Sequence, residues 1–318
     1  RYCFDFSADE NGTPCMNYYG FGHGVGMSQC GMVGYAQEQG MGYRDILRHY
    51  YTGVSFGTVG SGVLEEGDIS IGMGTAANIL AASSRCRFEK GCNLITNLAV
   101  VPERWFMEGS LIVCGPILTW MRDLLYGKEA ETMSSSDLYA LLNREAGQDS
   151  TPGAHGLTLV PHLQGAGCPY WDDDATGVLD GLTLSTTRAD LIRCVMEGMA
   201  MEVNKNLRLL LENGIRPQRL VLTGGASRSP VWCQIQADVY GVPVEIPAHP
   251  DVAALGSAIL AGWACGLFAT PAEGVRRIAR TARVYTPHPQ RHALYSRLTQ
   301  YHDALYRGAA QARAERNG

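Results

Sequence analysis

The chain has 318 residues, 46% of them hydrophobic, so it can bury a sizeable core and hold more than one domain. Its formal net charge of −5 gives no electrostatic basis for binding nucleic acid or an anionic membrane surface. The ten cysteines are scattered without a CxxC spacing, which argues against a disulfide framework or a zinc module and favours thiols in a reducing, cytoplasmic compartment.

The first segment, about residues 1–58, is dominated by a glycine-rich stretch. Every second residue over Gly20–Gly26 is glycine, which indicates a loop where side chains would obstruct a close approach. Ser28 is a candidate cap for a helix that ends near Gly40. The spacing does not match G-x-G-x-x-G in any register, so it does not support a dinucleotide site. His23 is either an acid–base residue or an imidazole that holds this loop.

A strand, a glycine-rich turn and a second strand are predicted next. Ile69–Ile71 and Ile79–Ala81 have strand character, and Gly72–Thr75 lies between them. Taken alone, this pattern is typical of an ordinary hairpin turn.

A helix is predicted within Phe106–Gly127, with Ser110 as a candidate cap and Gly127 as its stop. The residues expected on its apolar face are Ile117, Trp120, Met121, Leu124 and Leu125. Ser134–Ser136 is expected to cap a further short helix.

An acidic run, Asp172–Asp174, lies in the segment Pro169–Gly177. Three adjacent carboxylates could bind a cation, but a solvated turn is the favoured interpretation. Thr187 then caps a long helix over 188–213. Its apolar stripe is a core face and not a cofactor site, and it consists of Leu191, Val195, Met199, Val203, Leu207 and Leu211.

Arg219–Ile246 reads as a strand, a glycine turn, a helix and a second strand. The pair Gly224–Gly225 lets the backbone turn sharply and approach a ligand. Ser229, followed by Pro230, caps the helix, which Gly241 ends. Such a unit suits a phosphate or nucleotide, although a glycine pair alone is more often a tight loop.

Residues 252–318 are predicted to be mostly helical. Val252–Ala269 carries no charge, but its small residues and the capping Asp251 favour a closely packed interior helix over a membrane span. A polar helix follows Gly266. The final helix contains Leu294, Leu298, Tyr301, Leu305 and Tyr306. The tail 308–318 is expected to be frayed.

Three of these stretches together resemble the FGGY carbohydrate kinases. They are Thr223–Val244 with the sequence TGGASRSPVWCQIQADVYGVPV, Val252–Gly262 with VAALGSAILAG, and the long segment Gly156–Gly198, in the order of that family. The resemblance covers about residues 60–307 and implies the α/β fold of the actin and hexokinase type, which is ribonuclease H-like. It also implies ATP with Mg²⁺ as cofactors and a small sugar or polyol as substrate, and a homo-oligomer is left open.

The resemblance assigns nucleotide contacts to seven residues. Gly74 and Thr75 correspond to a Gly-Thr hairpin that contacts ATP phosphates through backbone and hydroxyl groups. Gly115 and Thr119 are placed beside the nucleotide. Gly225, Ala226 and Ser229 belong to the nucleotide-binding stretch. The substrate stays open because Gly165–Gly167 is closer to the glycerol kinase form, whereas the SRSPVW stretch is closer to the xylulose kinase form.

A different resemblance covers the first 58 residues. Gly20–Gly53, with its GHGVGMSQ core, is similar to the C-terminal end of the stage II sporulation protein D family, whose members cleave peptidoglycan or enhance amidases outside the cytoplasm. The acidic catalytic residue of that family lies upstream of this motif and is not in this chain.

The kinase resemblance leaves the catalytic position empty. The family's catalytic aspartate lies shortly before the Gly-Thr hairpin, at about Gly53, yet no Asp or Glu stands between Arg48 and Leu64. We therefore expect no catalytic residue in this chain, weak ATP binding and no sugar phosphorylation. Three interpretations stay open: half of an FGGY carbohydrate kinase, which is favoured, a non-catalytic nucleotide-binding fusion, and a peptidoglycan-associated module.

Overall fold

The computed structural model describes the backbone of residues 3–8, 14–19, 54–88, 90–91, 93–99 and 101–317, and side chains from residue 57 within these ranges to residue 316. The glycine-rich stretch Gly20–Gly53 lies outside the described residues, so the expectations for it stay predictions. Strands β1 (Cys3–Ala8) and β2 (Pro14–Tyr19) pair as an antiparallel hairpin.

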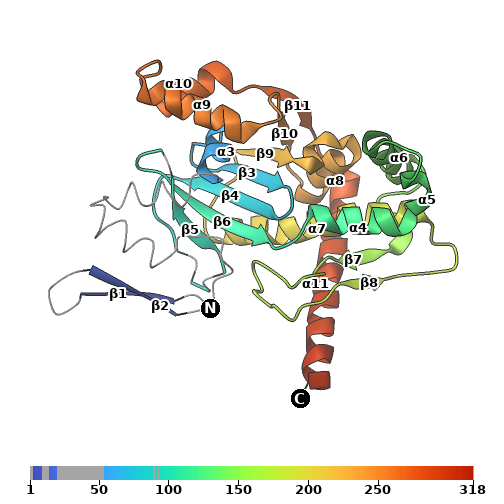
Figure 1. The fold of residues 1–318 in the computed structure, drawn as a ribbon. Helices are drawn as coiled ribbons and strands as arrows, with labels where there is room; N and C mark the ends of the chain where they lie inside the picture. The colour runs from blue at the N-terminus through green and yellow to red at the C-terminus, as the bar shows by residue number, and fades with distance from the viewer. Residues whose placement is uncertain are drawn as a thin grey trace.

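A seven-stranded sheet in the order β11-β10-β9-β3-β4-β6-β5 forms the centre of the fold (Figure 1). Parallel pairing joins β3 to β9 and β9 to β10, whereas the other neighbours are antiparallel. The strands are β3 (Asp68–Met73), β4 (Ala77–Ser83), β5 (Ile95–Leu98), β6 (Trp105–Leu111), β9 (Arg219–Gly224), β10 (Val244–Pro247) and β11 (Thr281–Tyr285). The predicted hairpin at Gly72–Thr75 is therefore confirmed as the β3–β4 turn.

Helices cover both faces of this sheet. On one face the main core joins Ile69, Ile71 and Met73 of β3 to the helices α4 (Gly115–Leu125), α7 (Arg188–Glu212) and α8 (Pro230–Tyr240). The other face carries α3 (Val54–Gly60), with α9 (Val252–Ala264) and α10 (Pro271–Ile278) packed beyond it (Figure 1). Strand β3 is buried along nearly its whole length because both of its faces are covered.

Helix α7 is the central helix of the main core, and its start follows from local chemistry. Thr187 and Asp190 form a reciprocal capping box, as the sequence predicts for Thr187. Asp190 also accepts a hydrogen bond from the hydroxyl of Ser150 (2.6 Å) and is hydrogen-bonded to Nδ1 of His155 (2.7 Å). Burial opposes ionisation of Asp190, but these hydrogen bonds outweigh it and lower its pKa to about 2.

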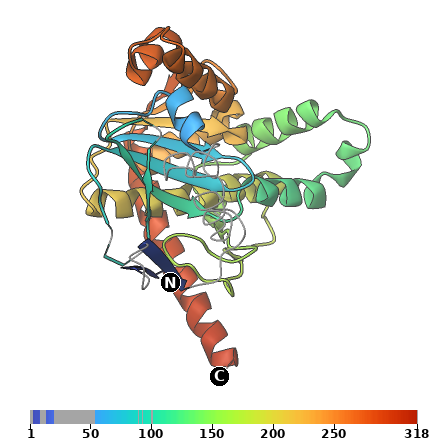
Figure 2. The ribbon, with the colours of Figure 1, turned by 60° about the vertical axis from the view of Figure 1, so that its left-hand side comes forward.

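Helices α5 (Gly127–Ala130) and α6 (Ser135–Gln148) extend the fold to one side as an arm with α4 (Figure 2). Ser134 caps α6 by accepting from the N–H of Asp137, as predicted. A short helix, η1 (Ala154–Gly156), and the hairpin of β7 (Thr158–Val160) and β8 (Val178–Asp180) follow.

The C-terminal helix α11 (Pro289–Asn317) runs along the hairpin strand β7 and projects from the body (Figures 1 and 2). A buried polar cluster holds it: Lys205 of α7 lies 2.8 Å from Glu202 and 3.0 Å from Asp303. His162 and His302 are buried beside them. The expectation that residues 308–318 are frayed is wrong as far as Asn317, because the helix continues to that residue.

Two further expectations are corrected. Ser110 does not cap a helix, since β6 pairs with β4 and β5, and this pairing decides the conformation of Trp105–Leu111. Helix α4 instead begins at Gly115, with Pro116 in its first turn, where the missing N–H has no helical partner to lose. It ends before Tyr126, and Gly127 begins α5.

The apolar helix α9 is not the interior helix that its composition suggests. Only Gly256 and Ile259 are fully buried within it. It packs instead against α3, so closely that a Cβ on Gly60 would meet the carbonyl oxygen of Val252 at 1.8 Å. Helix α3 crosses the expected boundary between residues 58 and 60. In the described part of the chain, no helix combines the length and apolarity of a membrane span.

Candidate functional site

Two glycine turns meet at one end of the sheet. Strand β3 ends at Met73, and the following turn closes when the N–H of Gly74 donates to the carbonyl of Ala76 (2.9 Å). The parallel neighbour β9 ends at Gly224, which is the register partner of Met73. The pairs Gly74–Thr75 and Gly224–Gly225 therefore lie side by side, as the family resemblance implies.

The start of α4 joins the same edge. The N–H groups of Cys114 and Gly115 donate to the carbonyls of Thr75 and Gly74, each at 2.8 Å. A Cβ on Gly115 would stand 2.7 Å from the Gly74 oxygen, so only glycine permits this contact without a shift. Gly74 and Thr75 stay exposed above it.

Gly224 and Gly225 have different structural requirements. Gly224 has φ of 83°, and a Cβ there would lie 2.3 Å from the carbonyl oxygen of Met73. The nearest atom to a Cβ on Gly225 is the same oxygen at 3.9 Å, an ordinary contact. The fold thus requires glycine at 224, whereas nothing in the fold requires it at 225. The space above Gly225 is available to a ligand.

The short helix η2 (Gly225–Arg228) leads into α8. Ser229 caps α8 by accepting from the N–H of Trp232 (3.1 Å), as predicted, and its hydroxyl also donates to the side-chain oxygen of Asn143. Ala226 is buried. The side chains of Ala226 and Ser229 therefore face the protein, so any contribution to a ligand comes from their backbone.

Thr119 lies one turn along α4 from Gly115. Its hydroxyl is 3.3 Å from the hydroxyl of Tyr139 on α6, which also accepts from Arg122 (3.1 Å). Thr119 therefore contributes to the contact between α4 and α6. Behind η2, the Cys233 thiol contacts the carbonyls of Ala226 (3.6 Å) and Ser227 (3.5 Å), and burial raises its pKa to about 12. It is protonated and unreactive at neutral pH.

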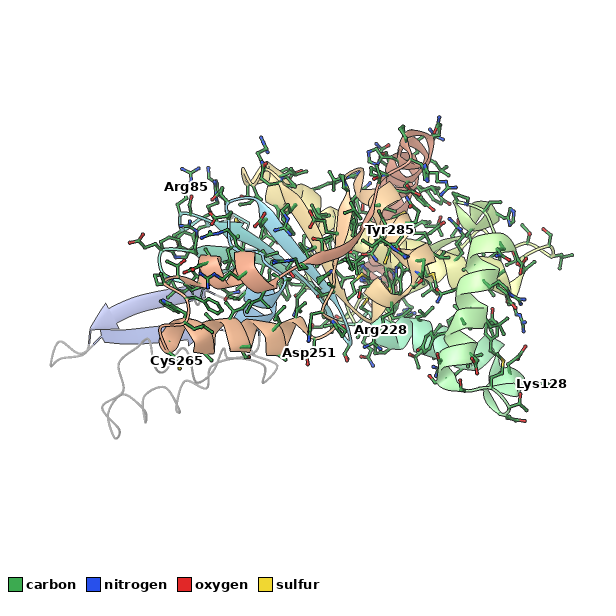
Figure 3. All side chains as sticks on the ribbon, turned by 90° about the horizontal axis from the view of Figure 1, so that it is seen from above. Arg85, Lys128, Arg228, Asp251, Cys265 and Tyr285 are labelled. Atoms are coloured by element: carbon green, nitrogen blue, oxygen red, sulfur yellow. The ribbon has the colours of Figure 1, made fainter. Side chains whose placement is uncertain are left out.

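A cavity of about 390 Å³ opens beside the glycine pair. One wall consists of Gly224, Gly225, Ser227 and Arg228, and the other of Ile246, Pro247, Ala248 and Pro250. Figure 3 shows Arg228 and Asp251, the residue after Pro250, near this end of the sheet. This depression is half open to solvent and is large enough to admit part of a small ligand.

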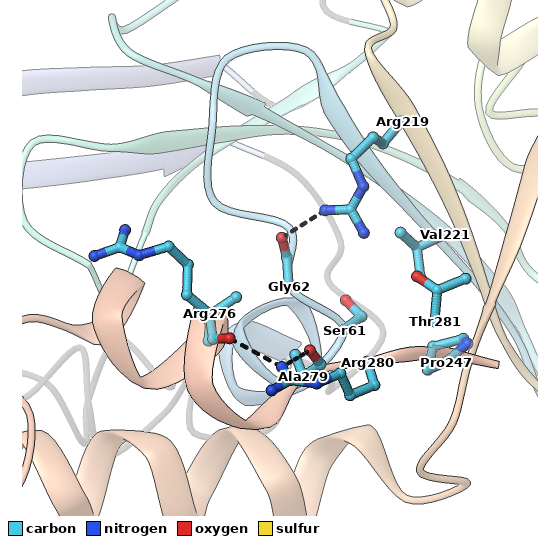
Figure 4. A pocket seen from close by; sticks show the side chains of 10 residues that line it. Ser61, Gly62, Arg219, Val221, Pro247, Arg276, Ala279, Arg280 and Thr281 are labelled. Atoms are coloured by element: carbon cyan, nitrogen blue, oxygen red, sulfur yellow. Dashed lines mark hydrogen bonds between the residues drawn. The ribbon is translucent and has the colours of Figure 1, made fainter.

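A second cavity, of about 210 Å³, lies between α3, β9 and α10 (Figure 4). Two of its three arginines are already occupied by the protein. Arg219 pairs with Glu245 (2.9 Å) and donates to the carbonyl of Gly62 (3.2 Å). Arg280 donates to three carbonyls at the end of α10, including that of Arg276. The larger cavity is therefore the better candidate.

The structure offers little for a metal ion. Among the residues that it describes, no group of three or more His, Cys, Asp and Glu side chains could hold one. In the acidic run, Asp172 accepts from Arg313 (2.7 Å) and from the hydroxyl of Tyr306 (3.1 Å). This pairing anchors α11 to the acidic turn.

Three residues near the edge were not anticipated from the sequence. Asn143 and Tyr139 reach Ser229 and Thr119 from α6, across 86 and 20 residues of chain. No local pattern signals such contacts. Arg228 lies in the SRSPVW stretch, and its position shortly after a glycine pair is the signal that the sequence offers.

Comparisons with known proteins show which family the chain matches. The FGGY family of carbohydrate kinases, C-terminal domain, matches residues 69–265. The xylulose kinase of Staphylococcus epidermidis is 26% identical over 259 residues, covering 81% of this chain and 50% of that protein. The glycerol kinase of Acidovorax ebreus is 35% identical over 210 residues, covering 63% of this chain and 40% of that kinase. The chain thus spans about half the length of the curated relatives it matches.

Solved structures give the same result in three dimensions. The crystal structure of xylulose kinase from Rhodospirillum rubrum superimposes with a TM-score of 0.72 at 29% identity, covering 81% of this chain and 50% of that one. The crystal structure of Plasmodium falciparum glycerol kinase with ADP has a TM-score of 0.67 at 20% identity, covering 80% and 49%, and shows the fold alone.

The sheet order and its glycine-lined edge define an α/β domain of the actin and hexokinase-like class. Within that class, the chain belongs to the FGGY family of carbohydrate kinases, which it matches through their C-terminal domain.

Proposed function

We propose that this chain is the nucleotide-binding half of an ATP-dependent kinase that phosphorylates a hydroxyl of a sugar or polyol. The observation that carries the proposal is the open space above Gly225, where a Cβ would meet nothing closer than 3.9 Å although the fold does not require glycine. A glycine that the fold does not need, beside a cavity, leaves room for the close approach of a ligand.

The proposed ATP site combines the turns at the sheet edge. Gly74 and Thr75 would contact the phosphates, since both are exposed and the N–H groups of Cys114 and Gly115 hold their carbonyls in place. Gly115 and Thr119 of α4 would lie beside the nucleotide. Gly225 is the point of closest approach. Ala226 and Ser229 would contribute their backbone.

Mg²⁺ does not fit a site made by the described residues, because the larger cavity has no carboxylate on its lining. We expect Mg²⁺ to arrive bound to the phosphates of ATP. Phosphoryl transfer also needs a carboxylate that accepts the proton of the attacking hydroxyl. None stands between Arg48 and Leu64, so we expect the chain alone to bind ATP without transferring phosphate.

The substrate class follows from the relatives. The matched proteins are named xylulose kinases and glycerol kinases, which act on a sugar and a polyol. We propose a small-molecule substrate of one of these two classes, and no role for nucleic acid or membrane.

The proposal is tested by titrating MgATP into the purified chain in a calorimeter and by assaying transfer to xylulose and glycerol. We expect saturable ATP binding, no transfer to either acceptor, and loss of binding in Gly225→Asp. Gly308→Asp is the matched control, because a Cβ there meets nothing within 4 Å on the remote helix α11. Phosphorylation by the pure chain, or no ATP binding at all, would contradict the proposal.

The division into residues 1–58, 60–307 and 308–318 stays a proposal, as does the sporulation protein D-like character of the first part. The support for that character is the glycine motif Gly20–Gly53. A peptidoglycan sedimentation assay tests this proposal. It is supported if the chain sediments with peptidoglycan and a variant with alanine at Gly22 and Gly24 does not. It is contradicted if the chain does not sediment with peptidoglycan. A cytoplasmic location is part of the same proposal for the kinase half, which leaves a homo-oligomer open.

A further inference from the structure

Arg228 is the one charged side chain that lines the larger cavity. It ends η2, three residues after Gly225, and it is exposed. Its guanidinium has no hydrogen bond or ion pair with any residue that the structure describes. An exposed arginine away from any cavity would not indicate a binding site. This arginine borders the space onto which Gly225 opens.

The surroundings of Arg228 leave its charge uncompensated within the cavity. The opposite wall consists of Ile246, Pro247, Ala248 and Pro250, which carry no charge. The carboxylate that follows them in the chain, Asp251, accepts from the N–H of Ala254 at 2.9 Å and caps α9. The guanidinium is therefore not neutralised by a carboxylate of the described residues, and its donors are available to an anionic ligand.

The wall that carries Arg228 is fixed in position by contacts within the fold. Gly224 is locked by the close approach to Met73, and Ser227 donates its hydroxyl to the carbonyl of Gly224 (2.7 Å). The thiol of Cys233 holds the carbonyls of Ala226 and Ser227 from behind. The backbone that carries Arg228 is therefore ordered without any contribution from its side chain.

We propose that Arg228 binds the phosphates of the nucleotide across this cavity. The planar guanidinium presents a fork of N–H donors that matches the oxygens of a phosphate. The assignment rests on the proposed function, and it names the phosphates, not the base, as the part that Arg228 recognises. It goes beyond the glycine turns because it adds a side chain whose contribution depends on ligand charge.

The test measures binding of ATP, ADP, AMP and adenosine to the full chain and to Arg228→Gln by calorimetry at low salt. We expect Arg228→Gln to weaken ATP about 10-fold and ADP less, and to leave adenosine unchanged. Arg228→Lys should recover part of the affinity, since it keeps the charge but loses the fork. Inorganic tripolyphosphate should compete with ATP for the chain and lose this ability in Arg228→Gln.

Arg307→Gln is the matched control, because Arg307 is an exposed arginine on α11, remote from the cavity. Arg228→Gln should melt at the same temperature as the parent chain, since the side chain is exposed and makes no hydrogen bond or ion pair with a described residue. Unchanged ATP affinity in Arg228→Gln, or equal weakening of adenosine, would overturn this assignment alone. Failure of the parent chain to bind ATP would instead overturn the proposed function.

Discussion

Alanine at Gly224 and alanine at Gly225 should have opposite effects, although the two glycines are adjacent. In Gly224→Ala the new Cβ would lie 2.3 Å from the carbonyl oxygen of Met73, at a φ of 83°. The backbone there has φ of 83° and ψ of −163°, a combination that is essentially restricted to glycine. Holding alanine in it costs about 1–3 kcal/mol, and relief of the clash must separate β9 from β3. We expect a total loss of about 2–4 kcal/mol in the free energy of unfolding.

In Gly225→Ala the nearest atom to the Cβ is 3.9 Å away, so the fold accommodates the methyl group. The free energy of unfolding should stay within about 0.5 kcal/mol of the parent chain, or rise slightly because the unfolded chain loses freedom. ATP affinity should fall at least about 10-fold, since the methyl group occupies the space proposed for the nucleotide.

Urea denaturation and calorimetric ATP titration of both variants separate stability from binding. Unaltered ATP affinity in a stable Gly225→Ala would refute the argument that a ligand, and not the fold, requires this glycine. Comparable destabilisation of the two variants would refute the steric distinction between them.

The remaining predictions concern the site edge and two buried titratable groups. Gly115→Ala should lower both the melting temperature and ATP affinity, because its Cβ would stand 2.7 Å from the Gly74 oxygen and displace the β3–β4 turn. Thermal denaturation and an ATP titration measure these two effects. An unshifted melting temperature would contradict the prediction. Asp190 has a pKa lowered to about 2, so its stabilisation is present above its unfolded pKa of about 4 and is lost as the pH falls toward 2. Asp190→Asn should therefore lower the free energy of unfolding by about 2 kcal/mol at pH 7. Urea unfolding at pH 7 and pH 2 measures this, and the difference in stability between the variant and the parent chain should vanish at pH 2. Burial, followed by the charge of Lys205, lowers the pKa of His162 to about 4. The unfolded chain takes up this proton below about pH 6.5 and the folded chain does not, so stability should fall between pH 6.5 and pH 4, and His162→Leu should flatten that slope in a series of urea titrations. An equal slope in both chains would show that other groups dominate.

The sequence predicts the elements whose signals are local. The caps at Thr187, Ser229 and Asp251, the glycine stop at Gly241 and the hairpin at Gly72–Thr75 are all confirmed. Each depends on residues within one turn or one hairpin of the element it defines. Local side-chain and backbone chemistry is sufficient for these features.

The errors occur where tertiary contacts decide the outcome. Trp105–Leu111 is a strand because β4 and β5 flank it, and the sequence around Ser110 carries no sign of those partners. The apolar composition of α9 suggested burial, but the packing of α3 through Gly60 covers only one side. The C-terminal helix persists to Asn317, and the cluster of Lys205, Glu202 and Asp303 that holds it near its middle joins residues about 100 apart.

The site shows the same division. The family resemblance brings together Gly74, Gly115 and Gly225, and the structure places the first two in direct backbone contact. The resemblance could not show that the fold requires glycine at 224 but not at 225. That difference depends on the position of the Met73 carbonyl oxygen. The side-chain contacts of Ser229 and Thr119 with α6 likewise depend on tertiary packing.

Hydrogen exchange of the full chain, with and without saturating MgATP, tests the central claim most directly. The account predicts added protection in three separate segments at once, around residues 73–77, 114–119 and 224–230, with α11 unchanged. These segments are distant in sequence and meet only at the proposed site. Protection confined to one segment, or none at saturating nucleotide, would contradict a nucleotide site at this edge of the sheet.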